Sequence, residues 1–241
     1  MSAALQLLRA LRFRLWALTV QARLRRLGGR LVLEVAEVPR FLSPPRLEID
    51  GYPGTLTLRI GRDVKIGRDL VLDVRAGLDG TIDIGDRVTF QNGVRLQPWG
   101  GAIRLAADAQ VRDRCELKSA GELRVGRRSI LGRTTTVHCE TAITIGDLCG
   151  FAERVTVIDS DHGFDGSGTF FMEQPLRSTA VTLADNVFLA TNVVVLRGTT
   201  IGANSVAAAG AVLNGGDFPG GHVIAGTPAR ALKALGGGAG S

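Results

Sequence analysis

A pattern of six residues repeats along most of the chain. From Leu183 to Val212 the sequence reads L-A-D-N-V-F, L-A-T-N-V-V, V-L-R-G-T-T, I-G-A-N-S-V and A-A-A-G-A-V. Each hexad opens with an aliphatic or small residue, and turn-forming residues follow it. Similar hexads begin at Ile60, Ile66 and Ile84. In the middle of the chain, related segments begin at Ala102, Glu122 and Ala142, a spacing of twenty residues that corresponds to three hexads and two additional residues.

A chain that turns a corner every six residues is expected to form a coil with three sides. Side chains alternate between the two faces of a strand, so positions one and five of each hexad point inward on every side. Stacked coils pair their strands in parallel, and the aliphatic rows fill the prism. Glycine, asparagine and aspartate then occupy the corners, where left-handed or tight backbone is needed. The pattern therefore predicts an all-β parallel β-helix, and the period alone leaves its hand open.

Residues 3–27 have a different pattern, typical of an amphipathic helix that ends at Gly28 and Gly29. The stretch between arginines, 15–22, is too short to span a bilayer. Two interpretations remain open: the helix lies on an anionic membrane, with its arginines at the headgroups and Trp16 and leucines below them, or it packs on its own domain or on a neighbouring subunit. The apolar face is predicted to consist of Leu5, Leu8, Leu11, Leu15, Leu18 and Ala22.

The length of 241 residues suits one main domain, and 32 glycines with only 5% aromatic residues indicate a glycine-dependent architecture. We predict a basic N-terminal helix at 1–29, lead-in strands at 30–57 and a β-helix domain at 58–232. A loop at 159–178 is expected to protrude from the β-helix, and 233–241 to form a flexible tail.

The net charge of +6 does not indicate nucleic-acid binding, because seven arginines precede the first acidic residue, Glu34, and the remainder is nearly balanced. Three cysteines, without a C-x-x-C pair, favour a reducing compartment and a cytoplasmic location. Cys115 and Cys149 occupy the inward fifth position of their hexads. They are expected to be structural thiols.

The regular register is interrupted once, after Val157, and hexads resume at Leu183. The intervening segment begins V-I-D-S-D-H-G-F-D-G-S-G and places His162 among aspartates. Its apolar residues include Phe164, Phe170, Phe171 and Met172. An exposed loop with this composition is expected to be covered by a neighbouring subunit.

The hexads, the D-x-D-H-G segment and V-I-A-G-T-P-A-R at 223–230 together resemble the hexapeptide-repeat acyltransferases, in particular the branch that O-acetylates sugars and polysaccharides. The resemblance covers roughly residues 58–232. It implies a left-handed β-helix, a homotrimer, acetyl-CoA as donor and a sugar or polysaccharide hydroxyl as acceptor. The amphipathic segment at 3–27 adds the expectation that this acceptor is a lipid-linked or polysaccharide precursor at the inner membrane face.

The resemblance also implies that His162 is the catalytic base. A sugar hydroxyl becomes a good nucleophile only as its proton is removed, and imidazole suits this task near neutral pH. Asp159 or Asp161 is expected to orient the other ring nitrogen. His138, about one coil earlier, is a candidate for acceptor binding, whereas His222 is expected in a loop at the end of the last coil.

Four positions match the coenzyme-binding residues of these enzymes. Thr191 and Ala209 provide small corner residues that let the pantetheine approach, and Arg230 and Lys233 provide cations for the phosphates. Leu213-Asn214 departs from the Thr-Lys pair that relatives commonly have before the exit turn.

Two other functions remain open. The gamma-type carbonic anhydrases share this fold and bind zinc through three histidines. Here the three histidines are separated by 24 and 60 residues, which disfavours that site, and no metal is expected. The second alternative is a β-helix scaffold without catalytic activity.

Overall fold

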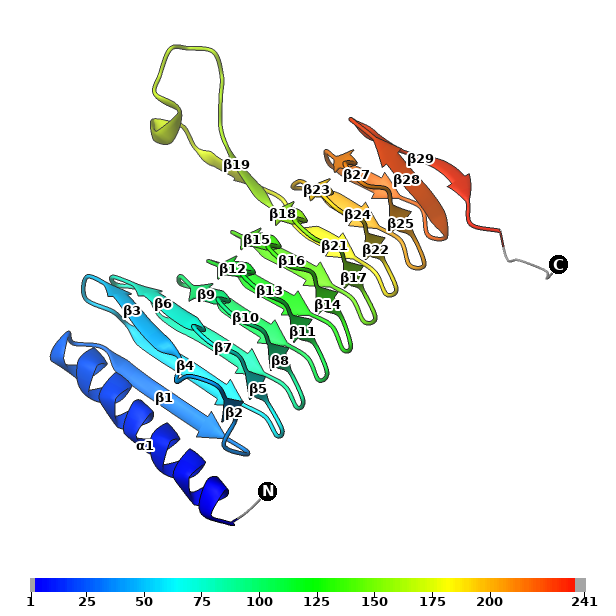
Figure 1. Cartoon of the computed structure of the whole chain (residues 1–241). Helices are drawn as coiled ribbons and strands as arrows, with labels where there is room; N and C mark the ends of the chain where they lie inside the picture. The colour runs from blue at the N-terminus through cyan, green and yellow to red at the C-terminus, as the bar shows by residue number, and fades with distance from the viewer. Residues whose placement is uncertain (1–2, 237–241) are drawn as a thin grey trace.

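A computed structural model describes residues 3–236 and shows a left-handed parallel β-helix with an N-terminal helix (Figure 1). Three sheets form the sides of the prism, and each complete coil up to β26 contributes one strand to each sheet in turn.

Sheet A contains β1 (Arg30–Val35), β4 (Thr55–Ile60), β7 (Gly80–Ile84), β10 (Ala102–Leu105), β13 (Glu122–Val125), β16 (Ala142–Ile145), β21 (Val181–Leu183), β24 (Thr199–Ile201) and β27 (Gly216–Phe218). Sheet B contains β2 (Arg40–Phe41), β5 (Lys65–Ile66), β8 (Thr89–Phe90), β11 (Gln110–Val111), β14 (Ile130–Leu131), β17 (Gly150–Phe151), β22 (Phe188–Leu189), β25 (Val206–Ala207), β28 (His222–Gly226) and β29 (Ala229–Ala234). Sheet C contains β3 (Arg46–Asp50), β6 (Val71–Arg75), β9 (Arg95–Pro98), β12 (Glu116–Ser119), β15 (Thr136–Cys139), β18 (Thr156–Ile158), β23 (Val194–Val195) and β26 (Val212–Leu213).

The predicted register is confirmed by the strand pairing. Ala102 pairs with Glu122, and Glu122 pairs with Ala142, so the twenty-residue spacing is one coil. Asparagines occupy corners with left-handed backbone, as predicted, with φ of 56° at Asn186 and 60° at Asn192.

The β-helix begins earlier and ends later than the hexads suggested. Strands β1, β2 and β3 pair with β4, β5 and β6, so residues 30–54 form a complete first coil, and residues 55–57 already belong to β4 of the second coil. At the other end, β29 pairs antiparallel with β28 and continues to Ala234, so it includes the first two residues of the predicted tail. The tail residues 237–241 lie outside the described part of the chain.

Helix α1 (Ala3–Arg26) packs on its own domain, but through the face opposite to the predicted one. The buried residues are Phe13, Trp16, Val20 and Leu24, which join the same core cluster as the strands. Trp16 Nε1 donates a hydrogen bond to Pro45 O at 2.7 Å. The expectation that Trp16 inserts into a membrane is therefore wrong, and all six residues of the predicted leucine face are exposed.

The three cysteines are free, and each is buried in the core of the prism, which confirms the inward placement expected for Cys115 and Cys149. Burial raises the pKa of Cys115 and of Cys139 to about 11, and raises the pKa of Cys149. Cys115 Sγ also donates to Gly132 O at 3.0 Å.

These thiols are expected to make stability fall at high pH. An unfolded thiol loses its proton near pH 9.0 and a folded one near 11, so the folded state binds more protons between these values. Each thiol then contributes about 2–3 kcal/mol to the free energy of unfolding, and this contribution is present below pH 9 and lost toward pH 11. Denaturant unfolding of the native protein and of Cys139→Ala at several pH values measures the difference. Equal pH slopes in the two proteins would contradict this expectation.

Candidate active site

A hairpin leaves the β-helix at the corner between sheets C and A and extends well beyond the coils (Figure 1). It consists of β19 (Ser160–His162), the 3-10 turn η1 (Phe171–Glu173) and β20 (Leu176–Ser178). Strands β19 and β20 pair antiparallel. The predicted loop at 159–178 is therefore present, and it has a paired, regular base.

His162 lies at the end of β19, and its side chain is exposed. Its ring and that of Phe171 form a T-shaped pair, with ring centroids 5.3 Å apart and planes at 84°. Phe164, Phe170 and Met172 are each more than half exposed on the same hairpin. The histidine is thus accessible and borders an uncovered apolar surface.

Asp159 has no exposed surface and binds the backbone of the preceding coil. Its Oδ1 accepts a hydrogen bond from Glu140 N at 2.6 Å, and its Oδ2 accepts from Thr141 N and Ala142 N, both at 2.8 Å. Its carbonyl oxygen accepts from Thr179 N at 2.9 Å, on the returning side of the hairpin. Asp159 therefore fixes both sides of the hairpin base to the β-helix.

Asp161 contacts a different partner, since its Oδ1 accepts from Arg197 Nε at 2.7 Å. Neighbouring residues of a strand point to opposite faces, so Asp161 and His162 diverge. Within residues 3–236, no hydrogen bond joins the His162 ring to either aspartate. Sequence reasoning missed Arg197, because it lies in an ordinary hexad and approaches the hairpin only through the stacking of the coils.

The other two histidines lie on strands. His138 is half-buried on the outer face of β15, and burial, followed by the charge of Lys118, lowers its pKa. His222 begins β28 rather than lying in a loop, and its Nδ1 is 2.7 Å from Gly220 O. Among the described residues, no group of three or more histidine, cysteine or acidic side chains is arranged to hold a metal ion.

The predicted coenzyme residues gather at another corner, between sheets B and C. Gly210 N donates to Thr191 O at 3.0 Å, which stacks the turns that carry Thr191 and Ala209. Arg230 and Lys233 are exposed on β29, immediately after the next turn at this corner. A single chain therefore holds His162 and the coenzyme residues at two different corners.

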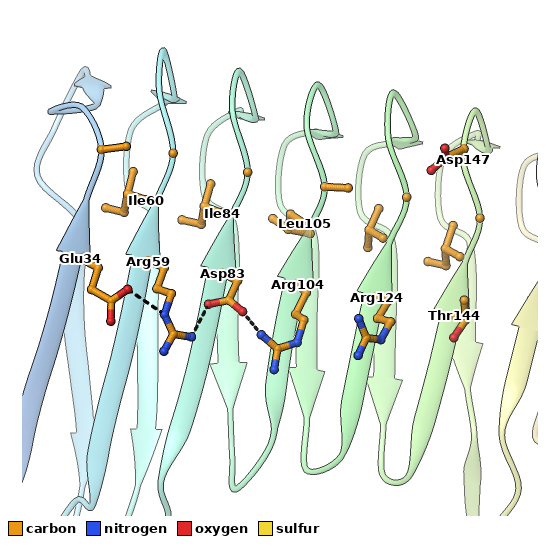
Figure 2. A pocket seen from close by; sticks show the side chains of 18 of the residues that line it. Glu34, Arg59, Ile60, Asp83, Ile84, Arg104, Leu105, Arg124, Thr144 and Asp147 are labelled. Carbon is orange, nitrogen blue, oxygen red and sulfur yellow. Dashed lines mark hydrogen bonds and ion pairs between the residues drawn. The ribbon is translucent and has the colours of Figure 1, made fainter.

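A wide groove lies away from both corners, along the edge between sheets A and B (Figure 2). Its volume is about 940 Å³, and no residue of the hairpin lines it. The charges beside it pair with one another: Arg59 contacts Glu34 and Asp83 at 3.0 Å each, and Arg104 also contacts Asp83. This groove is therefore separate from the hairpin and from the corner that carries Thr191 and Ala209.

The stacked hexads and the left-handed β-helix that they form place the chain in the class of hexapeptide-repeat proteins. Over 165 residues the chain is 32% identical to the "Putative lipopolysaccharide biosynthesis O-acetyl transferase WbbJ" of Escherichia coli K12, covering 64% of this chain and 72% of that protein. The chain belongs to the hexapeptide-repeat acetyltransferase family and is an acyltransferase.

Two further comparisons agree with this assignment. The "Probable acetyltransferase Rv3034c" of Mycobacterium tuberculosis is 32% identical over 113 residues, which is 47% of this chain and 37% of that protein. The crystal structure of the hexapeptide-repeat acetyltransferase VCA0836 of Vibrio cholerae with acetyl coenzyme A superposes with a TM-score of 0.50 at 27% identity, covering 54% of this chain and 69% of that one. No family model matches the chain.

Proposed function

We propose that the protein transfers an acetyl group from acetyl-CoA to a hydroxyl of a glycan, with His162 as the general base. The observation that carries the proposal is the exposed histidine on a hairpin fixed to the β-helix, in a chain that belongs to an acetyltransferase family. The relative WbbJ is named for lipopolysaccharide O-acetylation, and VCA0836 was crystallised with acetyl coenzyme A. The first name supports a glycan acceptor, and the second supports acetyl-CoA as the donor.

In this reaction, His162 removes the proton of the acceptor hydroxyl as its oxygen attacks the thioester carbonyl. The carbon–sulfur bond then breaks, the imidazolium of His162 gives the proton to the departing sulfur, and coenzyme A leaves as the thiol while the acetyl ester remains on the glycan. Asp159 and Asp161 serve as positioning residues, because their carboxylates hold the base of the hairpin through Thr141 N and Arg197. His138 lies on β15, the strand that pairs with β18, and is proposed to contact the acceptor.

The donor is proposed to lie along the corner that carries Thr191 and Ala209. Small side chains there permit close backbone approach, and the exposed cations Arg230 and Lys233 suit the coenzyme phosphates. Because His162 and this corner are separate in one chain, the complete site requires a neighbouring subunit. A homotrimer supplies one, and it also covers Phe164, Phe170 and Met172.

The function is tested by incubating the purified protein with a panel of acyl-CoA donors and candidate glycans. The expected result is release of free coenzyme A thiol and one new acetyl ester per turnover, with acetyl-CoA preferred. Absence of transfer to every glycan, from a protein that is trimeric by light scattering, would refute the proposed function.

The protein is further proposed to work at the cytoplasmic face of a membrane, with the outward face of α1 against anionic lipids. No described helix has the length and apolarity that crossing a bilayer requires. The outward leucines are more than half exposed, and arginines flank them, so leucines can enter the interface while arginines meet the headgroups.

Replacing Leu11 and Leu15 together with glutamine is expected to weaken binding to anionic vesicles about tenfold or more, since each exposed leucine loses apolar contact with the lipid. Deleting the whole helix is a poorer test, because it would uncover the first coil. Leu148→Gln, at an exposed leucine away from α1, is the matched control in vesicle co-sedimentation. Equal binding of both variants and the native protein would exclude this surface as the lipid contact.

A further inference from the structure

The outer face of sheet C carries a cluster of side chains, two coils from the strand of His138, that the proposed reaction does not use. Trp99 follows β9, and the guanidinium carbon of Arg75 lies 3.5 Å from the centroid of its ring. Lys118 Nζ lies 4.7 Å from the same centroid. In the part of the chain that the structure describes, neither cation takes part in an ion pair. Their N–H groups are therefore available to a ligand.

Two buried polar atoms of this cluster have no hydrogen-bond partner: Trp99 Nε1 and Gln97 Oε1. Gln97 is only 4% exposed, and its Nε2 donates to Asp73 Oδ2 at 2.9 Å, which fixes the orientation of the amide. One donor and one acceptor, two residues apart in the chain, are thus unsatisfied at a cost in free energy. A hydroxyl group can satisfy both kinds of atom, because it donates one hydrogen bond and accepts others.

A cavity of about 340 Å³ opens at this cluster, and both Gln97 and Trp99 line it. The carboxylates of Glu48 and Asp73 also line it, and Arg95 Nη1 contacts them at 2.7 and 2.8 Å. Planar polar groups and an aromatic ring around a small open cavity suit a ligand with many hydroxyls. A carbohydrate has this chemistry.

The strand register places this cavity in line with the hairpin. Gln97 pairs with Lys118, and Lys118 pairs with His138, so the three side chains form one outward row across β9, β12 and β15. The next strand, β18, leads directly into the hairpin (Figure 1). At the usual strand spacing, Gln97 and His138 are roughly 10 Å apart. An oligosaccharide covers this span, and a single sugar does not.

We infer that the acceptor is an oligosaccharide or a longer glycan, and that Gln97, Trp99, Arg75 and Lys118 bind sugar units remote from the acetylated hydroxyl. This inference rests on the proposed function for the identity of the acceptor. Gln97 and Trp99 bind sugar hydroxyls, and the two cations bind further oxygen atoms of the chain. The surface therefore sets the preference for acceptor length without taking part in the acetyl transfer.

Ligand binding can be measured without turnover, because the sequence contains only two tryptophans. In Trp16→Phe, the fluorescence of Trp99 reports directly on this cavity. A printed array of bacterial surface oligosaccharides of one to six sugars identifies the bound structure, which is then titrated with its monosaccharide unit for comparison. We expect the longer form to bind at least tenfold more tightly and to change the Trp99 emission.

Arg75→Ala and Gln97→Leu, each in the Trp16→Phe background, are expected to remove this advantage of the longer form. Both should leave the KM for acetyl-CoA unchanged. Arg124→Ala, at an exposed cation of sheet A, is the matched control. Arg75 is exposed, so its variant remains informative if Gln97→Leu fails to fold. The inference is overturned if no oligosaccharide binds more tightly than its monosaccharide, or if Arg75→Ala behaves like the control. Binding that persists without any acetyl transfer would instead refute the proposed function alone.

Discussion

His162→Ala is expected to lower kcat/KM for acetyl transfer by about 10²–10⁴-fold, because the acceptor hydroxyl loses the group that removes its proton. The expected loss is in kcat, since the imidazole acts on the reacting atoms and contributes little to holding acetyl-CoA. Stability should change by less than about 0.5 kcal/mol, because the side chain is exposed and touches mainly Phe171. Steady-state rates from the release of coenzyme A thiol, together with thermal unfolding, provide both measurements.

Two further variants sharpen this test. His162→Asn keeps a hydrogen-bonding side chain but cannot accept the proton, so it should be as inactive as the alanine variant. His222→Ala removes a histidine whose ring contacts the backbone carbonyl of Gly220, and it should retain normal activity. If His162→Ala keeps more than a third of the native rate, the base is another group and the assignment is wrong.

The fold was predictable because its cause is local and repeated. Each hexad has the same pattern of inward and outward positions. An irregular hexad in one coil therefore does not change the fold that the other coils predict. The hairpin was predictable for the same reason, since it is the place where the period fails, between Val157 and Leu183. The buried thiol of Cys149 followed from its inward position, and the structure confirms it.

The first coil and the helix face were less predictable, for physical reasons. The first coil is longer than later ones, since Arg30 pairs with Thr55 whereas Ala102 pairs with Glu122, and the longer strands obscure the period of six. Helix α1 has apolar residues on two opposite sides, so spacing alone cannot decide which side packs. The side with Phe13 and Trp16 fills the open end of the prism, because large aromatic groups bury more apolar area there than leucines do.

The roles of the aspartates depend on contacts between coils, which sequence spacing does not reveal. Both residues precede His162 closely, and both were candidates for orienting its ring. In the structure, Asp159 points into the molecule toward the turn at 140–142, while Asp161 pairs with Arg197. Two acidic residues two positions apart thus have very different surroundings. We therefore expect a large loss of stability on replacing Asp159 and a small one on replacing Asp161.

Asp159→Ala is expected to destabilise the protein by roughly 3–5 kcal/mol, because three buried backbone N–H groups lose their charged acceptor. For a chain of this size, the midpoint of thermal unfolding should fall by about 10 °C or more. Asp159→Asn should lie between the native protein and the alanine variant, since one amide oxygen can still accept while the new NH₂ group faces an N–H donor. Circular dichroism with heating and denaturant measures all three proteins.

Asp161→Asn is the matched comparison, because its ion pair with Arg197 is largely exposed and should contribute at most about 1 kcal/mol. The Asp159→Asn variant is also expected to lose activity. At temperatures where this variant remains folded, its kcat for acetyl transfer should fall by about 10²-fold, because a loosened hairpin base displaces His162 from the acceptor hydroxyl. A change in KM for acetyl-CoA without a change in kcat would point to a different role. An Asp159→Ala protein as stable as Asp161→Asn would show that the buried carboxylate does not fix the hairpin to the β-helix.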